Sequence, residues 1–496
     1  MTAAPSADQQ VLTLEVGPMA HGGHCVARYE GRVVFVRHAI PGEVVRARLT
    51  EGGAQAKFWR ADVVEVLSAS DYRRRHIWKL ADSLRAEEMG RLPVGGAEFG
   101  HITDQHQRRL KGQVFRDTLQ RIGGIPLHDL HIPQEHADGE IHVEDISRPH
   151  SNGLHWRTRV SFAVGPGGML SMKPHRSNEL IELRGMPLAV EAVHESRIFS
   201  ADFRGAQRVD AVAPGGEGAV TLVVHTLAQG QEQQSLRSRL HALASEDPSL
   251  GNILLGVTTP ETQNRRSENG RPTGRRGRSA RGRAASPTSA RVDFELLAGD
   301  RQVSEPLPVP AREDRSVVQL RPEGFWQIHR GAPQALVGAV AEMARTEADD
   351  AVVDLYAGAG LFTAWAAHRV GQRGRVLSVE AAGASHRSAS ELFEGLEEVQ
   401  TLQAPVERSL EQVRSFFSGS PGTVVLDPPR AGAGERVIGG LDQSQARQIV
   451  YVSCEPASFA RDAKELISRG WRLDGLRVLD LYPNTHHMES VASFTR

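Results

Sequence analysis

The stretch DLYAGAGLF, residues 354–362, follows an apolar run and carries two glycines ahead of a helix-like segment. Glycines at a strand-to-helix turn let the backbone approach a ligand closely. Position 363 is Thr363, so the fuller glycine pattern of a dinucleotide-binding loop is incomplete. Glu380 ends the next predicted strand, where an acid can bind both hydroxyls of a ribose; a surface residue is the alternative. An acid before the loop, Asp354, fits an S-adenosylmethionine pocket better than a dinucleotide-binding loop, because this cofactor has no pyrophosphate to hold.

Around this loop, from about residue 325 onward, strand-like and helix-like segments alternate, which predicts a doubly wound α/β sheet. The predicted strands are 351–355, 375–380, 423–427 and 449–452, followed by a hairpin-like pair at 473–481 and 490–494.

Two further motifs follow predicted strands. Asp427 begins the sequence DPPR, in which two prolines stiffen the exit from the strand; a simple strand-to-loop stop is the alternative. Cys454 ends the run IVYVSC, residues 449–454, at the edge where open α/β sheets place their chemistry. A single thiol there is a candidate nucleophile, and a small packed residue is the alternative.

The loop DLYPNTHHMES, residues 480–490, places ionisable side chains between two apolar strands. Glu489 is a candidate general base, His487 could orient its neighbours, and a surface loop between hairpin strands is the alternative. His486 and His487 lack a third ligand at a suitable spacing, so no metal site is predicted.

The N-terminal part is predicted to be a small β domain. Short strand-like runs at 11–16, 32–36, 43–49 and 62–66 suit a barrel of the oligonucleotide-binding kind. Either a basic RNA-binding face or an ordinary solvated surface is compatible with its arginines and lysine, which are Arg28, Arg37, Arg46, Arg48, Lys57 and Arg60.

Between these parts, a helix is predicted at 104–122, ended by Gly123-Gly124, and mixed α/β structure at 155–260. Residues 262–290 contain many arginines among Gly, Ser, Pro and Asn, with no apolar period. They are expected to form a flexible cationic loop that either contacts phosphates or is a tolerated insertion.

The composition is that of an ordinary soluble protein, with 496 residues, 40% hydrophobic and 24% charged. Only Cys25 and Cys454 are present, which excludes a disulfide framework and favours the cytoplasm. The N-terminus shows no secretory signal, and no apolar run approaches the roughly 20 residues that span a bilayer. The formal net charge of −1 means that any basic surface must be local.

Taken in order, the motifs resemble the RNA 5-methyluridine methyltransferase family, and the N-terminal β domain resembles that family's TRAM domain. The motifs that carry the resemblance are FWQ at 325–327, DLYAGAG at 354–360, Glu380, DPPR at 427–430, SCEP at 453–456 and Thr485-x-His487-x-Glu489.

The resemblance implies three domains in this chain. They are an RNA-binding, OB-like TRAM barrel at 8–70, a linking helix and central α/β domain at 75–320, and a Rossmann-like, S-adenosylmethionine-dependent methyltransferase domain at 321–496. The implied reaction is methylation of C5 of a uridine in structured RNA, tRNA or rRNA.

The resemblance also implies residue roles. Gln327, Tyr356, Glu380 and Asp427 would bind S-adenosylmethionine, Cys454 would be the nucleophile and Glu489 the base. Because uracil C5 is a poor nucleophile, addition of a thiolate to C6 would make C5 enolate-like, and removal of the C5 proton would then free the enzyme. The target base must be turned out of its stack to reach both groups.

The chain departs from the family at several positions. Val94 and Ala97, in VGGAEFGH at 94–101, stand where many members have iron–sulfur cysteines. Met186, which precedes Pro187, also stands at such a cysteine position. With two cysteines no iron–sulfur cluster is expected. Glu455 and His329 replace common asparagines, which bears on substrate identity and fine positioning.

Two other functions are compatible with parts of this pattern. The first is a methyltransferase acting on an exocyclic base nitrogen, where Asp427 and the prolines would position the amine and Cys454 would be incidental. The second is a non-catalytic RNA-binding paralogue that uses the β domain and the arginine-rich segment.

Overall fold

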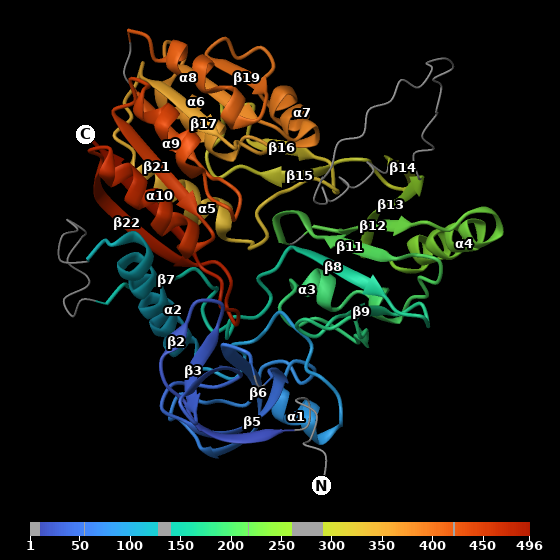
Figure 1. Cartoon of the computed structure of the whole chain (residues 1–496). Helices are drawn as coiled ribbons and strands as arrows, with labels where there is room; N and C mark the ends of the chain where they lie inside the picture. The colour runs from blue at the N-terminus through green and yellow to red at the C-terminus, as the bar shows by residue number, and fades with distance from the viewer. Residues whose placement is uncertain (1–9, 54, 127–139, 217, 260–290, 420–421) are drawn as a thin grey trace, which may run out of the picture.

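The computed structural model describes residues 10–53, 55–126, 140–216, 218–259, 291–419 and 422–496. The chain forms three large sheets, with the N-terminal sheet at one end, the C-terminal sheet at the other and a central sheet beside them (Figure 1). The predicted cationic segment at 262–290 lies outside the described residues. Within the described ranges, no helix is long and apolar enough to cross a membrane.

The N-terminal sheet has six strands in the order β1-β5-β6-β4-β3-β2. The predicted strands are present, but the short β2 and the longer β3, on either side of the Gly22-Gly23 turn, were not predicted. The hydrogen-bond ladder of the described residues does not close into a barrel. The strands are β1 (Val11–Glu15), β2 (Met19–Ala20), β3 (His24–Tyr29), β4 (Arg32–Arg37), β5 (Val44–Glu51) and β6 (Phe58–Ser68).

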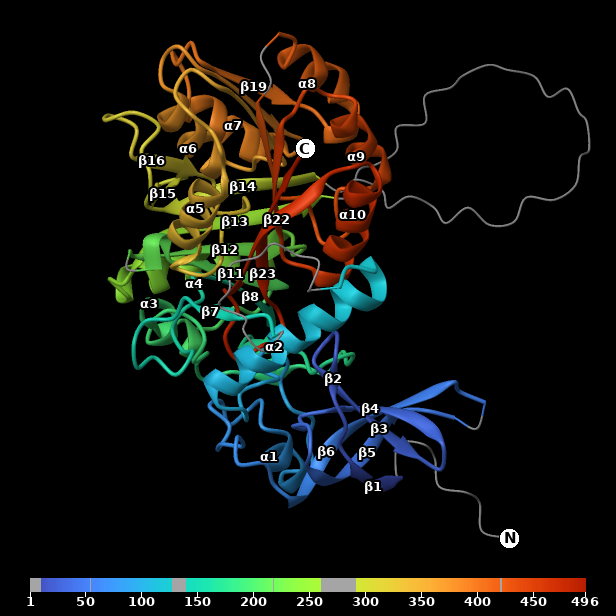
Figure 2. The same ribbon diagram turned by 90° about the vertical axis from the view of Figure 1, so that its left-hand side faces the viewer.

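A long helix connects the N-terminal sheet to the C-terminal part. Helix α2 (Asp104–Thr118) continues into a π-helical turn at Leu119–Gly123, and Gly124 ends it with a left-handed φ of 64°. The predicted helix at 104–122 is therefore present. Helix α2 runs from β2 toward α10 (Pro456–Ser468), as Figure 2 shows, and a short helix, α1 (Ser83–Glu88), precedes it.

The central sheet has seven strands in the order β10-β9-β8-β11-β12-β13-β14. Val94, Ala97 and Met186 are buried together in its apolar cluster, beside Trp78. The elements are β8 (Arg159–Val164), β9 (Leu170–Met172), β10 (Ile181–Glu182), α3 (Glu191–His194), β11 (Arg208–Val212), β12 (Val220–Thr226), α4 (Gly230–Glu246), β13 (Leu250–Thr259) and β14 (Arg291–Ala298), followed by the β15 (Val303–Pro306) and β16 (Val317–Leu320) pair.

The C-terminal sheet has the order β19-β18-β17-β20-β21-β23-β22-β7. All neighbouring pairs are parallel except those that involve β23, which runs antiparallel to both β21 and β22. The strands are β7 (Val143–Asp145), β17 (Ala351–Leu355), β18 (Arg375–Glu380), β19 (Val399–Gln403), β20 (Thr423–Leu426), β21 (Gln448–Ser453), β22 (Arg472–Asp480) and β23 (Glu489–Thr495).

Helices cover both faces of this sheet, as a doubly wound fold requires. One face packs against α5 (Ala332–Met343), α6 (Leu361–Val370) and α7 (Gly383–Leu392). The other packs against α8 (Leu410–Phe416), α9 (Gly434–Asp442) and α10. The edge strand β7 comes from more than 200 residues upstream of β17, so the sequence pattern of the C-terminal half did not predict it.

Three buried histidines pack where the N-terminal sheet meets the segment before α2. The ring centroid of His101 lies 6.2 Å from that of His38 and 6.3 Å from that of His76. Burial lowers the pKa of His38 to about 3 and that of His76 to about 4, and it lowers the pKa of His101 well below the usual value. All three rings are therefore neutral in the folded protein.

We predict that acid weakens this junction. The unfolded chain binds protons at these histidines near pH 6.5 and the folded one does not, so the stabilisation is complete above pH 6.5 and is lost as the pH falls toward 4. Each histidine lowers the free energy of unfolding by up to about 1.4 kcal/mol per pH unit in that window. Urea unfolding from pH 7 to 5 measures the slope, which His101→Phe should reduce. The control His241→Gln, at an exposed position, should not; equal slopes in all three proteins would contradict the account.

Candidate active site

The glycine loop after β17 holds Glu380 at its mouth. The amide of Gly358 donates a hydrogen bond of 2.8 Å to Glu380 Oε2, and the amide of Ala382 donates one of 2.5 Å to Oε1. Gly360 has a φ of 94°, and a Cβ atom there would lie 2.6 Å from the Phe393 ring, so only glycine fits. The loop thus presents its backbone and the Glu380 carboxylate at the carboxyl edge of the sheet.

A cluster of buried carboxyl groups lies behind this loop. Thr363 donates to Asp354 Oδ2 at 2.6 Å, whereas Asp354 Oδ1 is buried and has no described partner. Burial raises the pKa of Asp354 to about 7, and the charges of Asp427 and Glu380 act in the same direction. Burial also raises the pKa of Asp427 to about 7, against the hydrogen bond that it receives from Gln327. Such a cluster favours a ligand that brings positive charge or hydroxyl donors.

Tyr356 stands in the same loop with a left-handed φ of 60°. A non-glycine residue rarely adopts this conformation, which costs free energy and is frequent at binding sites. Its ring is half-buried against the apolar core, so the side chain is held in place beside the pocket. The predicted cofactor residues Tyr356, Glu380 and Asp427 thus end or follow strands at one edge of the sheet, and Gln327 joins them through its hydrogen bond with Asp427.

Strand pairing places Cys454 opposite Glu489. Ser453 of β21 pairs with Ser490 of β23, and the next residue outward on each strand is Cys454 or Glu489. Because β23 runs antiparallel to β21, these two side chains meet at the carboxyl end of β21. The other cysteine, Cys25, is fully buried in the N-terminal sheet, where its thiol donates to the carbonyl of Ala39.

Both groups favour the protonated form when no ligand is bound. Burial raises the pKa of the Cys454 thiol to about 12, and the charges of Glu489 and Asp427 add to this effect, while Arg430 opposes it. Burial also raises the pKa of Glu489 well above its usual range. Glu489 Oε2 accepts a hydrogen bond of 3.2 Å from the Tyr482 hydroxyl, and its buried Oε1 has no described partner.

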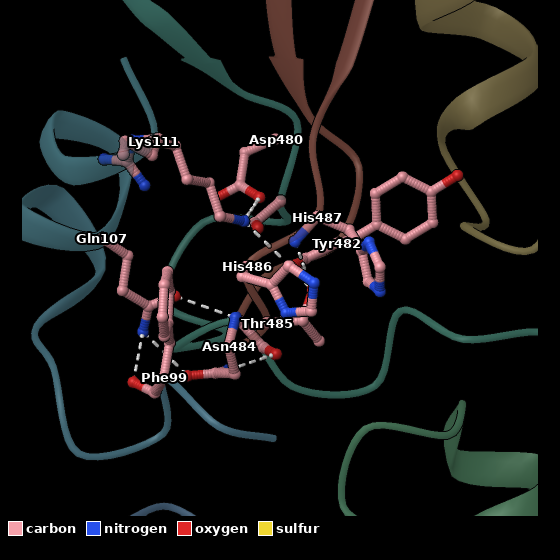
Figure 3. A network of polar contacts seen from close by, with 12 residues as sticks. Phe99, Gln107, Lys111, Asp480, Tyr482, Asn484, Thr485, His486 and His487 are labelled. Carbon is pink, nitrogen blue, oxygen red and sulfur yellow. Dashed lines mark hydrogen bonds and ion pairs between the residues drawn. The ribbon is translucent and has the colours of Figure 1, made fainter. Parts of the chain in front are cut away.

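Helix α2 fixes the loop that carries Glu489. Lys111 forms a buried ion pair with Asp480, at 2.6 Å between Nζ and Oδ1, and donates to the carbonyl of Tyr482 at 3.0 Å. Figure 3 shows Lys111 reaching toward Asp480 at the base of this loop. Sequence reasoning missed Lys111 because its partners are some 370 residues away in the chain.

A second hub in this loop is Asn484, which is fully buried with a φ of 64°. The side chain of Gln107, on α2, accepts a hydrogen bond of 2.8 Å from the backbone amide of Asn484 and donates one of 2.9 Å to the side-chain oxygen of Asn484 (Figure 3). Arg74 donates to the same oxygen at 2.7 Å, and the Asn484 side chain donates to the carbonyl of Gly153 at 2.8 Å. Every polar group of Asn484 is thus bonded to a distant segment, which restricts how the loop can move.

Arg157 lies near Tyr482, whose hydroxyl bonds to Glu489. The Nε of Arg157 donates to the carbonyl of Arg159 at 3.0 Å, and no described carboxylate forms an ion pair with it. Burial lowers the pKa of Arg157, and Tyr482 acts in the opposite direction. His329 lies nearby but is structural: burial lowers its pKa to about 4, and its Nδ1 accepts from the Gly331 amide. A half-buried guanidinium without an acidic partner suits a ligand oxygen.

The N-terminal sheet closes the pocket above Cys454. The turn between β2 and β3 contributes His21 and Gly23, which line this pocket together with Cys454, Lys111 and His487. His21 Nε2 lies 3.0 Å from Glu455 Oε1, and this hydrogen bond raises the pKa of His21. Burial lowers the pKa of His487 to about 3, so that ring is neutral. Within the described parts of the chain, no group of His, Cys, Asp or Glu could hold a metal ion.

Comparisons with known proteins agree with this architecture. The family model described as tRNA (Uracil-5-)-methyltransferase matches residues 295–496, and the TRAM domain model matches residues 6–64. A Streptomyces avermitilis protein named as an uncharacterized RNA methyltransferase is 34% identical over 482 residues, which cover 97% of this chain and 96% of that protein. The chain belongs to the tRNA (uracil-5-)-methyltransferase family.

More distant relatives extend the comparison within this family. The Pseudomonas aeruginosa 23S rRNA (uracil(1939)-C(5))-methyltransferase RlmD is 28% identical, with 99% of this chain and 95% of that protein covered. The crystal structure of Pyrococcus abyssi tRNA (uracil-54, C5)-methyltransferase, in complex with S-adenosyl-L-homocysteine, matches 97% of this chain and 99% of its own with a TM-score of 0.61 and 19% identity. The predicted family, fold class and enzyme class are confirmed, and RNA is the substrate class of this methyltransferase.

The protonated state of Cys454 leads to a test in the ligand-free methyltransferase. Iodoacetamide reacts with the thiolate, so alkylation of Cys454, located by peptide mass spectrometry, should rise about tenfold per pH unit from pH 7 to 10. A short unstructured peptide with one cysteine, measured in parallel, should level off above the ordinary cysteine pKa of about 8.5. Glu489→Gln should shift the Cys454 curve to lower pH, because it removes a charge that raises the thiol pKa. A plateau for Cys454 below pH 9 would contradict this assignment.

Proposed function

We propose that this methyltransferase transfers a methyl group from S-adenosylmethionine to C5 of a uridine in structured RNA, tRNA or rRNA, through a covalent bond between Cys454 and C6. The observation that carries the proposal is the strand pairing that places a thiol opposite a carboxyl group. Methylation at C5 needs a nucleophile for C6 and a base for the C5 proton, whereas methylation of an exocyclic nitrogen needs no thiol. The relatives from Pseudomonas aeruginosa and Pyrococcus abyssi are named for the same atom of uracil.

The residues of the glycine loop fit the cofactor. Glu380 at the loop mouth would accept hydrogen bonds from the ribose hydroxyls, and Tyr356 would contact the adenine with its ring. Gln327 and Asp427 would bind near the methionine part, where the buried carboxyl cluster matches a sulfonium charge. The unpartnered Oδ1 of Asp354 offers one more acceptor. When bound, S-adenosylmethionine supplies an electrophilic methyl group and leaves as the neutral thioether.

Cys454 acts first in the proposed sequence. Its thiol releases a proton to solvent, the thiolate sulfur forms a bond to C6, and the electrons of the C5–C6 double bond move toward the C4 carbonyl oxygen to give an enolate. In the ligand-free protein the surrounding carboxyl groups oppose this ionisation. A cationic ligand beside Asp427 removes part of that opposition, so the thiol is activated when the site is filled. Arg157, which has no described acidic partner, would donate to a uracil carbonyl and stabilise the enolate.

Glu489 completes the reaction. Once C5 carries the methyl group, the Glu489 carboxylate removes the C5 proton, the double bond forms again and the bond between C6 and sulfur breaks. The raised pKa of Glu489 makes its carboxylate a stronger base, which suits the removal of a proton from carbon. Tyr482, held by Lys111 through its carbonyl, keeps the carboxyl group pointed at this atom.

The organisation of the chain is part of the same proposal. The division at 8–70, 75–320 and 321–496 is supported by the three sheets except at β7, which belongs to the C-terminal sheet, and the N-terminal domain is expected to bind RNA. A cytoplasmic location is supported by the low cysteine content.

RNA that contains 5-fluorouridine tests the proposal. A base cannot remove fluorine from C5 in the way it removes a proton, so the last step is blocked. In the presence of S-adenosylmethionine, the protein and the RNA should therefore form a covalent adduct that survives denaturing gel electrophoresis. Cys454→Ala should abolish the adduct, whereas Cys25→Ala, which changes a thiol remote from the sheet edge, should retain it. Methylation of ordinary RNA by Cys454→Ala at the normal rate would refute the nucleophile and favour the exocyclic nitrogen.

A further inference from the structure

A row of aromatic rings crosses the outer face of the N-terminal sheet. Cys25 of β3, Val36 of β4 and Ala61 of β6 point into the core, so their neighbours in sequence point outward. The outward rings are His24, Phe35 and Phe58, with centroids 6.2 Å apart for the first pair and 5.4 Å for the second. Phe58 is 38% exposed.

The row begins at the candidate active site. A Cβ atom on Gly23, next to His24, would lie 2.8 Å from the Cβ of His486, so turn and loop are in direct contact. The His486 ring lies 4.0 Å from that of His487, and both line the pocket above Cys454. The row of rings and the pocket above Cys454 therefore lie on adjoining parts of the protein.

Arginines flank the row at its far end. The Arg60 guanidinium lies 4.7 Å above the Phe58 ring, and Arg60 pairs with Phe35 across β6 and β4. A cleft between this sheet and the central domain is lined by four arginines, and each of them is ion-paired: Arg37 with Asp62, Arg48 with Glu87, and both Arg60 and Arg176 with Glu51. Four guanidinium groups facing three carboxylates leave one positive charge in excess.

His24 joins the rings to these charges. Its ring centroid lies 6.2 Å from that of His175, on the central-domain side of the cleft. Burial lowers the pKa of His24 to about 4, and Arg37, His175 and Arg60 act in the same direction. The ring is therefore neutral at pH 7. A neutral, partly exposed ring can stack on a base.

We propose that the row of His24, Phe35 and Phe58 binds unpaired bases of the RNA strand that flank the target uridine. The inference rests on the proposed function, since a uridine turned out of its stack leaves neighbouring bases unstacked as well. Bases stack on aromatic rings whatever their sequence, while guanidinium groups bind the phosphates between them. Adjacent rings in the row are nearly perpendicular, at 77° and 78°, so bases would insert against separate ring faces rather than lie on one flat surface.

Single-strand binding by the full-length protein tests this assignment. The probes are a fluorescein-labelled 12-nucleotide uridine strand and a blunt 12-base-pair RNA duplex, with Kd measured by fluorescence anisotropy. Phe35→Leu/Phe58→Leu keeps the sheet apolar but removes two rings, and it should weaken binding of the single strand at least about fivefold. The slope of log Kd against log salt concentration should not change, because no cation is lost. Arg60→Ala should instead reduce that slope by about 0.7.

The matched control is Leu67→Ala, which changes an apolar side chain on β6 that is 50% exposed and lies away from the row. It should leave both Kd values unchanged, and circular dichroism melting should show that all variants are folded. An unchanged Kd for the single strand in the double variant would overturn the proposal and indicate that the rings serve a protein partner.

Methylation separates this inference from the proposed function. The double variant should retain the wild-type rate in a single turnover at saturating RNA and show a raised KM, because no ring touches the reacting atoms. If the wild-type protein does not methylate uridine at C5, the proposed function fails, while the anisotropy result still decides whether the rings bind RNA.

Discussion

The antiparallel pairing of β23 with β21 is the constraint on which the active site depends. It joins Ser453 to Ser490, and the Ser490 hydroxyl donates to the Ser453 carbonyl at 3.3 Å. Because side chains alternate along a strand, a slip of one residue would turn Glu489 away from Cys454. The register also depends on the β22–β23 hairpin, and hence on the 480–490 loop. This loop is bonded to α2 through Lys111 and Gln107.

The electrostatics of the site determine when the Cys454 thiol can ionise. Burial raises the pKa of Cys454, and the neighbouring carboxyl groups of Glu489 and Asp427 add to this effect, so the thiol stays protonated until ligands enter. A thiol that reacts only in a filled site avoids oxidation and alkylation while the enzyme is idle. The N-terminal sheet takes part in this enclosure, since His21 bonds to Glu455 directly beside Cys454. RNA binding and cofactor binding are thus connected to one reactive atom.

Local sequence patterns predicted the elements whose signals are local. Strand β17 and the residues of α2 followed from apolar runs and helical periodicity, and Glu380 from its place at a strand end. Strand β3 was not predicted because its short apolar run, Cys25-Val26-Ala27, contains a single strong strand former, and β7 was not predicted because it joins the sheet from far upstream. Lys111 and Asn484 could not be identified either, since contacts between distant segments give them their roles. Val94, Ala97 and Met186 were recognised as non-ligands, and the structure adds that they pack together in an apolar cluster.

The intact mass of the Glu489→Gln variant after incubation with ordinary RNA and S-adenosylmethionine tests the pairing of Cys454 with Glu489 most directly. Without the base, the C5 proton should remain and the bond between Cys454 and C6 should persist. The spectrum should then show a species heavier than protein plus RNA by one methylene group, and it should be absent when Cys454→Ala is added. Release of methylated RNA by Glu489→Gln at the wild-type rate, with no adduct, would contradict the account.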